Sequence, residues 1–122
     1  MSRIRPTRPV EQKPEKAERN RAYMGRVAQL PCCICEAFGM AQTSPTQVHH
    51  CTHGRYSTSR APDHMTIPLC EGHHQGLRDT SKLAIHQGKK TWLNAFGADY
   101  EWAERVRKRL GRTVFDNATD LH

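Results

Sequence analysis

Apolar positions recur at helical spacing near both ends of the chain. Between Glu15 and Leu30 they predict an amphipathic helix, which Pro31 ends because the residue before a proline disfavours helical backbone. The segments 89–96 and 100–110 show the same spacing, with Trp92 of the first and Trp102 of the second expected in the core. Gly111 stands where a helix C-terminus favours glycine, so we expect the last helix to end there.

The middle of the chain predicts two short strands. Residues 47–52 and 65–69 carry residues suited to a half-buried sheet, and the polar segment 54–63 is expected to join them as a loop. A helix is expected over residues 71–78, and Ser81 is the expected N-cap of a further short helix that carries His86. The pattern therefore predicts an α+β domain in which a β-hairpin is followed by helices.

Composition limits the size of the core. The chain has 122 residues, 36% of them hydrophobic, and a mean hydropathy of -0.80. We divide it into a disordered basic arm (residues 1–14), one domain (residues 15–111) and a frayed C-terminal tail (residues 112–122). A small domain with so few apolar residues usually needs a disulfide or a structural metal.

Charge and the absence of membrane signals point to a partner and a compartment. The net charge of +7 indicates an anionic partner, most commonly nucleic acid. The positive excess lies mainly in residues 1–30, where the arm either follows a phosphate backbone or is only a solvated tail. The sequence has no apolar run of the ~20 residues that a bilayer requires and no secretory leader, which predicts a cytoplasmic protein with no membrane partner. Cysteines in that compartment stay reduced and act as metal ligands.

Cysteines and histidines are concentrated in one segment, and their spacing predicts a structural zinc site. All five cysteines and seven of the eight histidines lie between Cys32 and His86. Zinc prefers four tetrahedral Cys or His ligands in pairs with short spacing, and two such pairs are present: Cys32, Cys35, Cys70 and His73. Two alternatives stay open, since Cys33 rivals Cys32, although its spacing to Cys35 is too short, and His74 could replace His73. Cys51 is left over as a small buried residue.

The remaining histidines suggest a second, catalytic metal site. His49 and His50 are adjacent on a predicted strand, where neighbouring side chains point to opposite faces. One division gives His49 to the metal and leaves His50 to act on water. His74 and His86 would complete a three-histidine face with an open coordination position, which distinguishes catalytic from structural sites.

Taken together, these motifs resemble those of HNH endonucleases. The resemblance implies a small ββα-metal core, similar to a treble-clef zinc fold, with a zinc knuckle and flanking helices. The similarity covers Ala28 to Gly97 and comprises Cys-x-x-Cys, a strand with His-His, Pro-Leu-Cys-x-x-His-His and a later His-x-Gly-Lys. Residues 66–70 and 88–92 most resemble phage-type, Ref-like RecA-dependent nucleases, and residues 85–89 resemble the final histidine segment of colicin-type DNases.

The resemblance implies roles for individual residues. It assigns His49 and His74 to one divalent catalytic metal (Mg²⁺, Mn²⁺, Ni²⁺ or Zn²⁺), with His86 as the third ligand, and it assigns His50 as the general base. The family's central Asn, which orients that base, is absent here, so the resemblance requires Asp63 or His64 to substitute for it. The implied substrate is DNA, and the Ref-like similarity implies a recombinase filament as a partner.

Basic residues near these motifs are candidates for phosphate contacts. They are Arg55, Arg60, Lys89 and Lys90, for which plain surface charge is an equally good interpretation. Two functions from different classes follow. The first is a metal-dependent DNA endonuclease of the phage or recombination type, and the second is a non-catalytic zinc module that binds DNA or protein.

Overall fold

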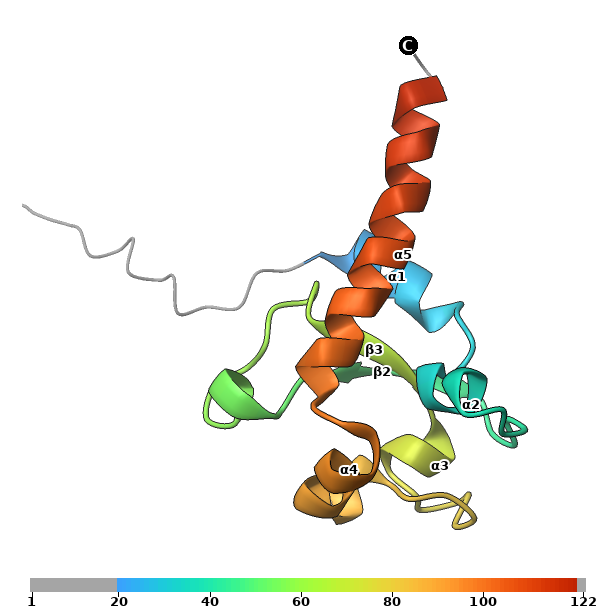
Figure 1. Cartoon of the computed structure of the whole chain (residues 1–122), viewed down its shortest axis with the longest axis vertical. Coiled ribbons are helices and arrows are strands. Elements are labelled where there is room, and N and C mark those ends of the chain that lie inside the picture. Colours follow the sequence, from blue (N-terminus) through green and yellow to red (C-terminus); the bar gives the residue numbers. More distant parts are fainter. Residues whose placement is uncertain (1–19, 121–122) are drawn as a thin grey trace, which may run out of the picture.

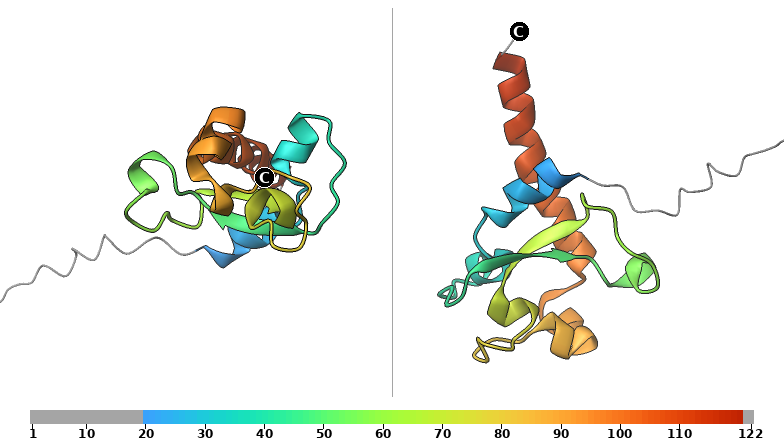
Figure 2. Two further views of the ribbon diagram at one scale, coloured as in Figure 1. Left: turned by 90° about the horizontal axis from the view of Figure 1, so that it is seen from below. Right: turned by 180° about the vertical axis from the view of Figure 1, so that it is seen from behind.

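Two antiparallel strands form the centre of the fold, and helices lie on both of their faces (Figures 1 and 2). The computed structural model describes residues 20–120, with side chains as far as residue 111. Its elements in chain order are α1 (Arg21–Ala28), α2 (Cys33–Ala37), β2 (Thr46–His50), η2 (Gly54–Tyr56), β3 (Thr66–Cys70), α3 (Glu71–His74), η3 (Ile85–Gln87), α4 (Lys89–Phe96) and α5 (Asp99–Asp120).

The hairpin sets the direction of the two adjacent histidines. Strand β2 pairs with β3 so that Thr46 stands opposite Cys70 and His50 opposite Thr66. Helix α1 lies on one face of this hairpin, whereas α4 and α5 lie on the other (Figure 2). Because successive side chains of a strand project to opposite faces, His49 and His50 are directed to different sides. Their hydrogen bonds agree, since His49 contacts Asp99 at the start of α5, and His50 contacts Asp63, which also binds the cap of α1.

The core lies between β3 and the helices. All five residues of β3 are buried, and Val27 of α1 and Trp92 of α4 are fully buried beside them. Trp92 and Trp102 are core residues, as expected. Leu93 was also expected on the inward face of this helix, beside Trp92 and Phe96, but 37% of it is exposed.

Three expected helix limits were wrong. Helix α3 ends at His74, before Arg78, because the chain turns through Gly76 at φ +65°. Ser81 does not cap a helix, since its hydroxyl donates to Asp79 and the short helix begins only at Ile85. The last helix passes through Gly111 and reaches Asp120.

The expected α+β class, with a two-stranded sheet, is confirmed. The arm at residues 1–14 lies outside the described residues, as do residues 121–122 of the expected tail. Within the described part of the chain, no helix is both long and apolar enough to cross a membrane.

Asp79 joins its own loop to the loop at residues 43–44, beside α3. Its Oδ2 accepts hydrogen bonds from the hydroxyls of Thr43 (2.6 Å) and Ser44 (2.9 Å), and its Oδ1 accepts from the hydroxyl of Ser81 (2.6 Å). The Ser44 hydroxyl in turn accepts from the backbone N–H of Gly72, so the network reaches the first turn of α3. The hydrogen bonds from Ser81 and Thr43 lower the pKa of Asp79 below its usual 3.8.

We expect Asp79→Asn to lower the melting temperature at neutral pH. Each oxygen of Asp79 accepts two hydrogen bonds, and the amide replaces one of these oxygens by an N–H₂ group that cannot accept them. A depressed folded pKa stabilises the fold at every pH above 3.8 and stops doing so only as the pH falls through the folded value. The difference in melting temperature from the unaltered protein should therefore be the same at about pH 7 and about pH 5. Thermal denaturation at both pH values tests this, with the exposed Glu101→Gln as control. Equal melting temperatures for Asp79→Asn and the unaltered protein would contradict it.

Candidate metal centres

Four side chains from three segments converge at one end of the hairpin as a buried Cys3His cluster: Cys32, Cys35, Cys70 and His73. Cys32 precedes α2 and Cys35 lies within it, Cys70 ends β3, and His73 lies on α3. The Nδ1 of His73 stands 3.4 Å from the Cys32 sulfur, 3.6 Å from the Cys35 sulfur and 3.3 Å from the Cys70 sulfur. The Cys35 and Cys70 sulfurs are 3.8 Å apart.

These spacings fit the edges of a zinc tetrahedron. Ligands bound at about 2.3 Å for sulfur and about 2.0 Å for nitrogen would place two sulfurs about 3.8 Å apart and a sulfur and nitrogen about 3.5 Å apart. The observed distances, 3.3 to 3.8 Å, agree with this. The cluster can therefore hold a structural metal such as zinc, and it contains His73, the first of the two histidines weighed for the position.

Local hydrogen bonding and burial determine the protonation of the ligands in this cluster. Cys32 caps α2, and its sulfur accepts the backbone N–H of Cys35 at 3.5 Å. Burial, reinforced by the neighbouring Cys32 and Cys70, raises the pKa of the Cys35 thiol to about 12. Burial also lowers the pKa of His73 to about 4, which keeps its imidazole neutral and able to ligate. Three closely packed thiols of this kind become thiolates only when a cation compensates their charge.

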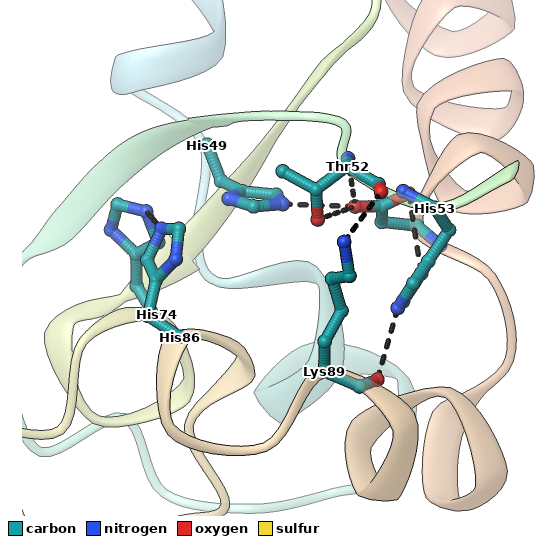
Figure 3. A network of polar contacts seen from close by, with 7 residues as sticks. His49, Thr52, His53, His74, His86 and Lys89 are labelled. Carbon is teal, nitrogen blue, oxygen red and sulfur yellow. Dashed lines mark hydrogen bonds and ion pairs between the residues drawn. The ribbon is translucent and has the colours of Figure 1, made fainter. Parts of the chain in front are cut away.

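A second group, the three-histidine cluster, consists of His49, His74 and His86, which come from β2, α3 and η3 (Figure 3). One ring nitrogen from each lies within 4.8 Å of the others. The Nε2 atoms of His74 and His86 are 3.1 Å apart. Two nitrogens bound at about 2.1 Å to one ion would stand about 3.0 Å apart at a right angle and about 3.4 Å apart at a tetrahedral angle. These three residues can therefore also hold a metal ion.

Hydrogen bonds determine which nitrogen two of these histidines present. Nε2 of His49 donates to Oδ2 of Asp99 at 2.9 Å, because a carboxylate can only accept, and Nδ1 is left with its lone pair. Nδ1 of His74 donates to Oε1 of Gln47 at 2.7 Å, which leaves Nε2 available. Metal-binding histidines are typically held in this way, by an acceptor on the nitrogen remote from the metal.

The electrostatic environment favours the neutral form of two of these histidines, His74 and His86. Burial, together with the nearby His49 and His86, lowers the pKa of His74 to about 3. Burial and the proximity of His49 also lower the pKa of His86, whose side chain is more exposed. Neutral imidazoles with free lone pairs are the form that binds metal.

His86 is brought to the cluster by a close contact between two turns. The side-chain amide of Gln87 donates to the carbonyls of Gln75 (2.7 Å) and Gly76 (2.9 Å), which ties η3 to the end of α3. Gly76 has φ +65°, and a Cβ there would stand 2.7 Å from the Cβ of Ala84. Any larger residue at position 76 would therefore push η3, and His86 with it, away from α3.

His50 lies outside the three-histidine cluster. Its Nε2 donates to Oδ1 of Asp63 at 2.9 Å, and its side chain is 27% exposed. Asp63 is buried, and Arg60 lies 3.6 Å from the same oxygen. The hydrogen bond from His50 lowers the pKa of Asp63. His64, the other candidate to orient the base, is half-buried in the turn before β3. The assignment of His50 as the general base stays a prediction.

The basic candidates are all exposed. Arg55 lies over the ring of Tyr56, with its guanidinium 5.4 Å from the ring centroid. Lys89 is nearest to the histidines, since its Nζ donates to the carbonyl of Thr52 at 3.2 Å and its charge contributes to the lowered pKa of His86. Lys90 follows it on the exposed side of α4.

Three polar residues at the site were missed by sequence reasoning. Gln47 carried a local signal, because it precedes His49 by two residues on the same face of a strand. His53 and Asp99 carried none, since they meet across 46 residues of chain.

The fold and these clusters define a small α+β protein with a buried Cys3His site suited to a structural metal. The chain belongs to the DUF968 family, described as "Protein of unknown function (DUF968)", whose model matches residues 7–109. No curated protein and no solved structure matches it.

Proposed function

We propose that this protein is a metal-dependent endonuclease that hydrolyses phosphodiester bonds in DNA. The observation that carries the proposal is the three-histidine cluster, which offers one ring nitrogen from each of three histidines beside a separate and complete Cys3His set. A purely structural role needs only the four-ligand set, because structural sites close their coordination sphere with protein ligands. Three ligands leave room for a phosphate oxygen or water.

The residues around the cluster have separate tasks. His49, His74 and His86 would hold the divalent ion, which supplies charge neutralisation at the scissile phosphate when bound. Lys89 stands beside them as a fixed positive charge for the DNA backbone. The net charge of +7 favours the approach of a polyanion.

His50 is the proposed general base. Its hydrogen bond to Asp63 leaves Nδ1 as the nitrogen that can accept a proton from water. His50 is the last residue of β2 and is partly exposed, so water can reach it at the end of the strand. This role requires the substrate to extend around that end, from the face of the three-histidine cluster toward the face of α1.

The direct test is a nicking assay with zinc-loaded protein on supercoiled plasmid and on single-stranded DNA, with Mg²⁺, Mn²⁺, Ni²⁺ and Zn²⁺ added separately. Cleavage that requires one of these ions and is lost in His74→Gln supports the proposal. The matched control is Gln75→Ala, one residue further along the same turn and outside both clusters. Binding of DNA without cleavage under any of these ions would instead support the non-catalytic zinc module.

We expect the N-terminal arm to contribute affinity for DNA and no chemistry. Deleting residues 1–14 removes Arg3, Arg5, Arg8 and Lys13. Each lost phosphate contact reduces the slope of log affinity against log salt by about 0.9 on duplex DNA. Fluorescence anisotropy over a series of salt concentrations should therefore give a shallower slope for the truncated protein. An unchanged slope would show that the arm is a solvated tail that does not touch phosphate.

A further inference from the structure

Behind His49 lies a buried network that no part of the proposed chemistry uses (Figure 3). Asp99 is fully buried at the start of α5. Besides His49, its carboxylate accepts the backbone N–H of Thr52 at 2.7 Å and that of His53 at 3.2 Å. Burial of this carboxylate opposes its ionisation, but the hydrogen bonds from His49 and Thr52 outweigh that and lower its pKa.

His53 extends the network to the segment that carries the third histidine. Its Nδ1 accepts the backbone N–H of Asp99 at 3.0 Å, and its Nε2 donates to the carbonyl of Lys89 at 3.0 Å (Figure 3). Both ring nitrogens of His53 are therefore occupied, which leaves none for metal or for proton transfer. Lys89 begins α4 three residues after His86, so β2 and the η3–α4 segment are joined through two buried side chains.

Packing holds this network in one place. After His53 the chain turns through Gly54 at φ +62°, and a Cβ there would stand 2.8 Å from the ring of Tyr100. Tyr100 follows Asp99 directly, so the turn after β2 is fitted against the first residues of α5. An unpaired charge at such depth would be costly, and here the Asp99 carboxylate accepts hydrogen bonds from His49, from the backbone and hydroxyl of Thr52, and from the backbone of His53.

We propose that Asp99 is the positioning residue of the three-histidine cluster: it keeps the proton of His49 on Nε2 so that Nδ1 faces the metal, and through His53 it sets the distance between His49 and His86. This inference rests on the proposed function, because it concerns the metal that the nuclease would use. It predicts the metal affinity of the three-histidine cluster, which can be measured without any DNA cleavage.

Asp99→Asn tests it. Nε2 of His49 and the backbone N–H of Thr52 both donate to Oδ2, so only one group of the asparagine amide can stand at that position. If its oxygen stands there, it still accepts from His49 but without the negative charge of a carboxylate. If its N–H₂ group stands there, the proton of His49 moves to Nδ1 and the ligating lone pair is lost. Loss of such a partner typically weakens metal affinity by about 10- to 100-fold. The measurement is a Co²⁺ titration of the zinc-loaded protein, followed by visible absorption. Cobalt–thiolate bands would report any exchange at the Cys3His cluster.

The matched control is Asp63→Asn, the other buried aspartate that accepts from a histidine Nε2 at 2.9 Å. It should leave Co²⁺ affinity unchanged, although it removes an equivalent hydrogen bond between a histidine and a buried carboxylate. Equal loss of affinity in both variants, or none in Asp99→Asn, would overturn the inference.

A second measurement needs no variant and so does not depend on Asp99→Asn folding. Nitrogen chemical shifts of the His49 ring in the zinc-loaded protein, without added Co²⁺, should show the proton on Nε2. A proton on Nδ1 would overturn the inference. The inference and the proposed function can fail separately: tight, Asp99-dependent Co²⁺ binding without DNA cleavage by any ion refutes only the nuclease, whereas cleavage with Asp99-independent binding refutes only the positioning role.

Discussion

Cys70→Ser should leave the domain without a cooperative unfolding transition and without bound zinc. Structural zinc contributes about 10–16 kcal/mol of apparent binding energy in small domains, whereas whole domains are stable by only about 5–15 kcal/mol. Cys70 also ends β3 and stands opposite Thr46, so its ligand bond would anchor the hairpin to both α2 and α3. A serine at this position removes the thiolate at almost constant volume. Circular dichroism during heating, together with metal analysis after dialysis, measures both effects.

Cys33→Ala is the control for this expectation. Cys33 is also buried and lies between two ligands of the Cys3His cluster, but it is not a member of that cluster. Its truncation should cost about 1 kcal/mol, in the range of an ordinary core substitution, and zinc should be retained. If Cys70→Ser keeps both its zinc and its melting temperature, the assignment of the structural site is wrong.

His50→Gln should reduce DNA cleavage by about 10²–10⁴-fold, the usual effect of losing a general base. Glutamine suits this test better than alanine, because its side-chain N–H can still donate to the buried Asp63, which alanine would leave unpaired. The variant should keep its zinc, its DNA affinity and its Co²⁺ affinity, since His50 lies outside both metal clusters. A single-turnover nicking assay at saturating metal measures the rate.

His74→Gln provides the contrasting result. It removes a ligand of the three-histidine cluster, so its activity should recover in part when the divalent ion is raised, whereas His50→Gln should gain nothing from added metal. Cleavage by His50→Gln at the unaltered rate would show that the α1 face of the hairpin takes no part in the reaction.

Local pattern predicted the elements whose determinants are local. Helix α4 runs over Lys89–Phe96 as its apolar spacing indicated. Spacing also predicted the grouping of Cys32, Cys35, Cys70 and His73, although it left His74 open in place of His73. The length of α3 did not follow, because the chain turns out of the helix through Gly76 at positive φ, where a side chain would collide with Ala84.

Polar partners that are far apart along the chain could not be predicted from the sequence. Asp99 had the appearance of an ordinary acidic residue at a helix start, and only the fold brings it to His49, 50 residues away. Ser81 is a local case instead, because its hydroxyl donates to Asp79, two residues earlier, and does not cap a helix. Alternation along β2 did indicate that His49 and His50 would separate, and the partners of each now show where they go.

Helix α3 carries a constraint on how the family can change in length. His73 belongs to the Cys3His cluster and His74 to the three-histidine cluster, although they are consecutive residues of a four-residue helix. One inserted residue rotates everything after it by about 100° around a helix axis, so an insertion between them would misdirect one set of ligands whichever way the helix adjusted. The exposed turn at residues 57–60 contributes no ligand to either cluster. Length variation among relatives is therefore expected to gather in that turn, while the His-His dipeptide stays uninterrupted.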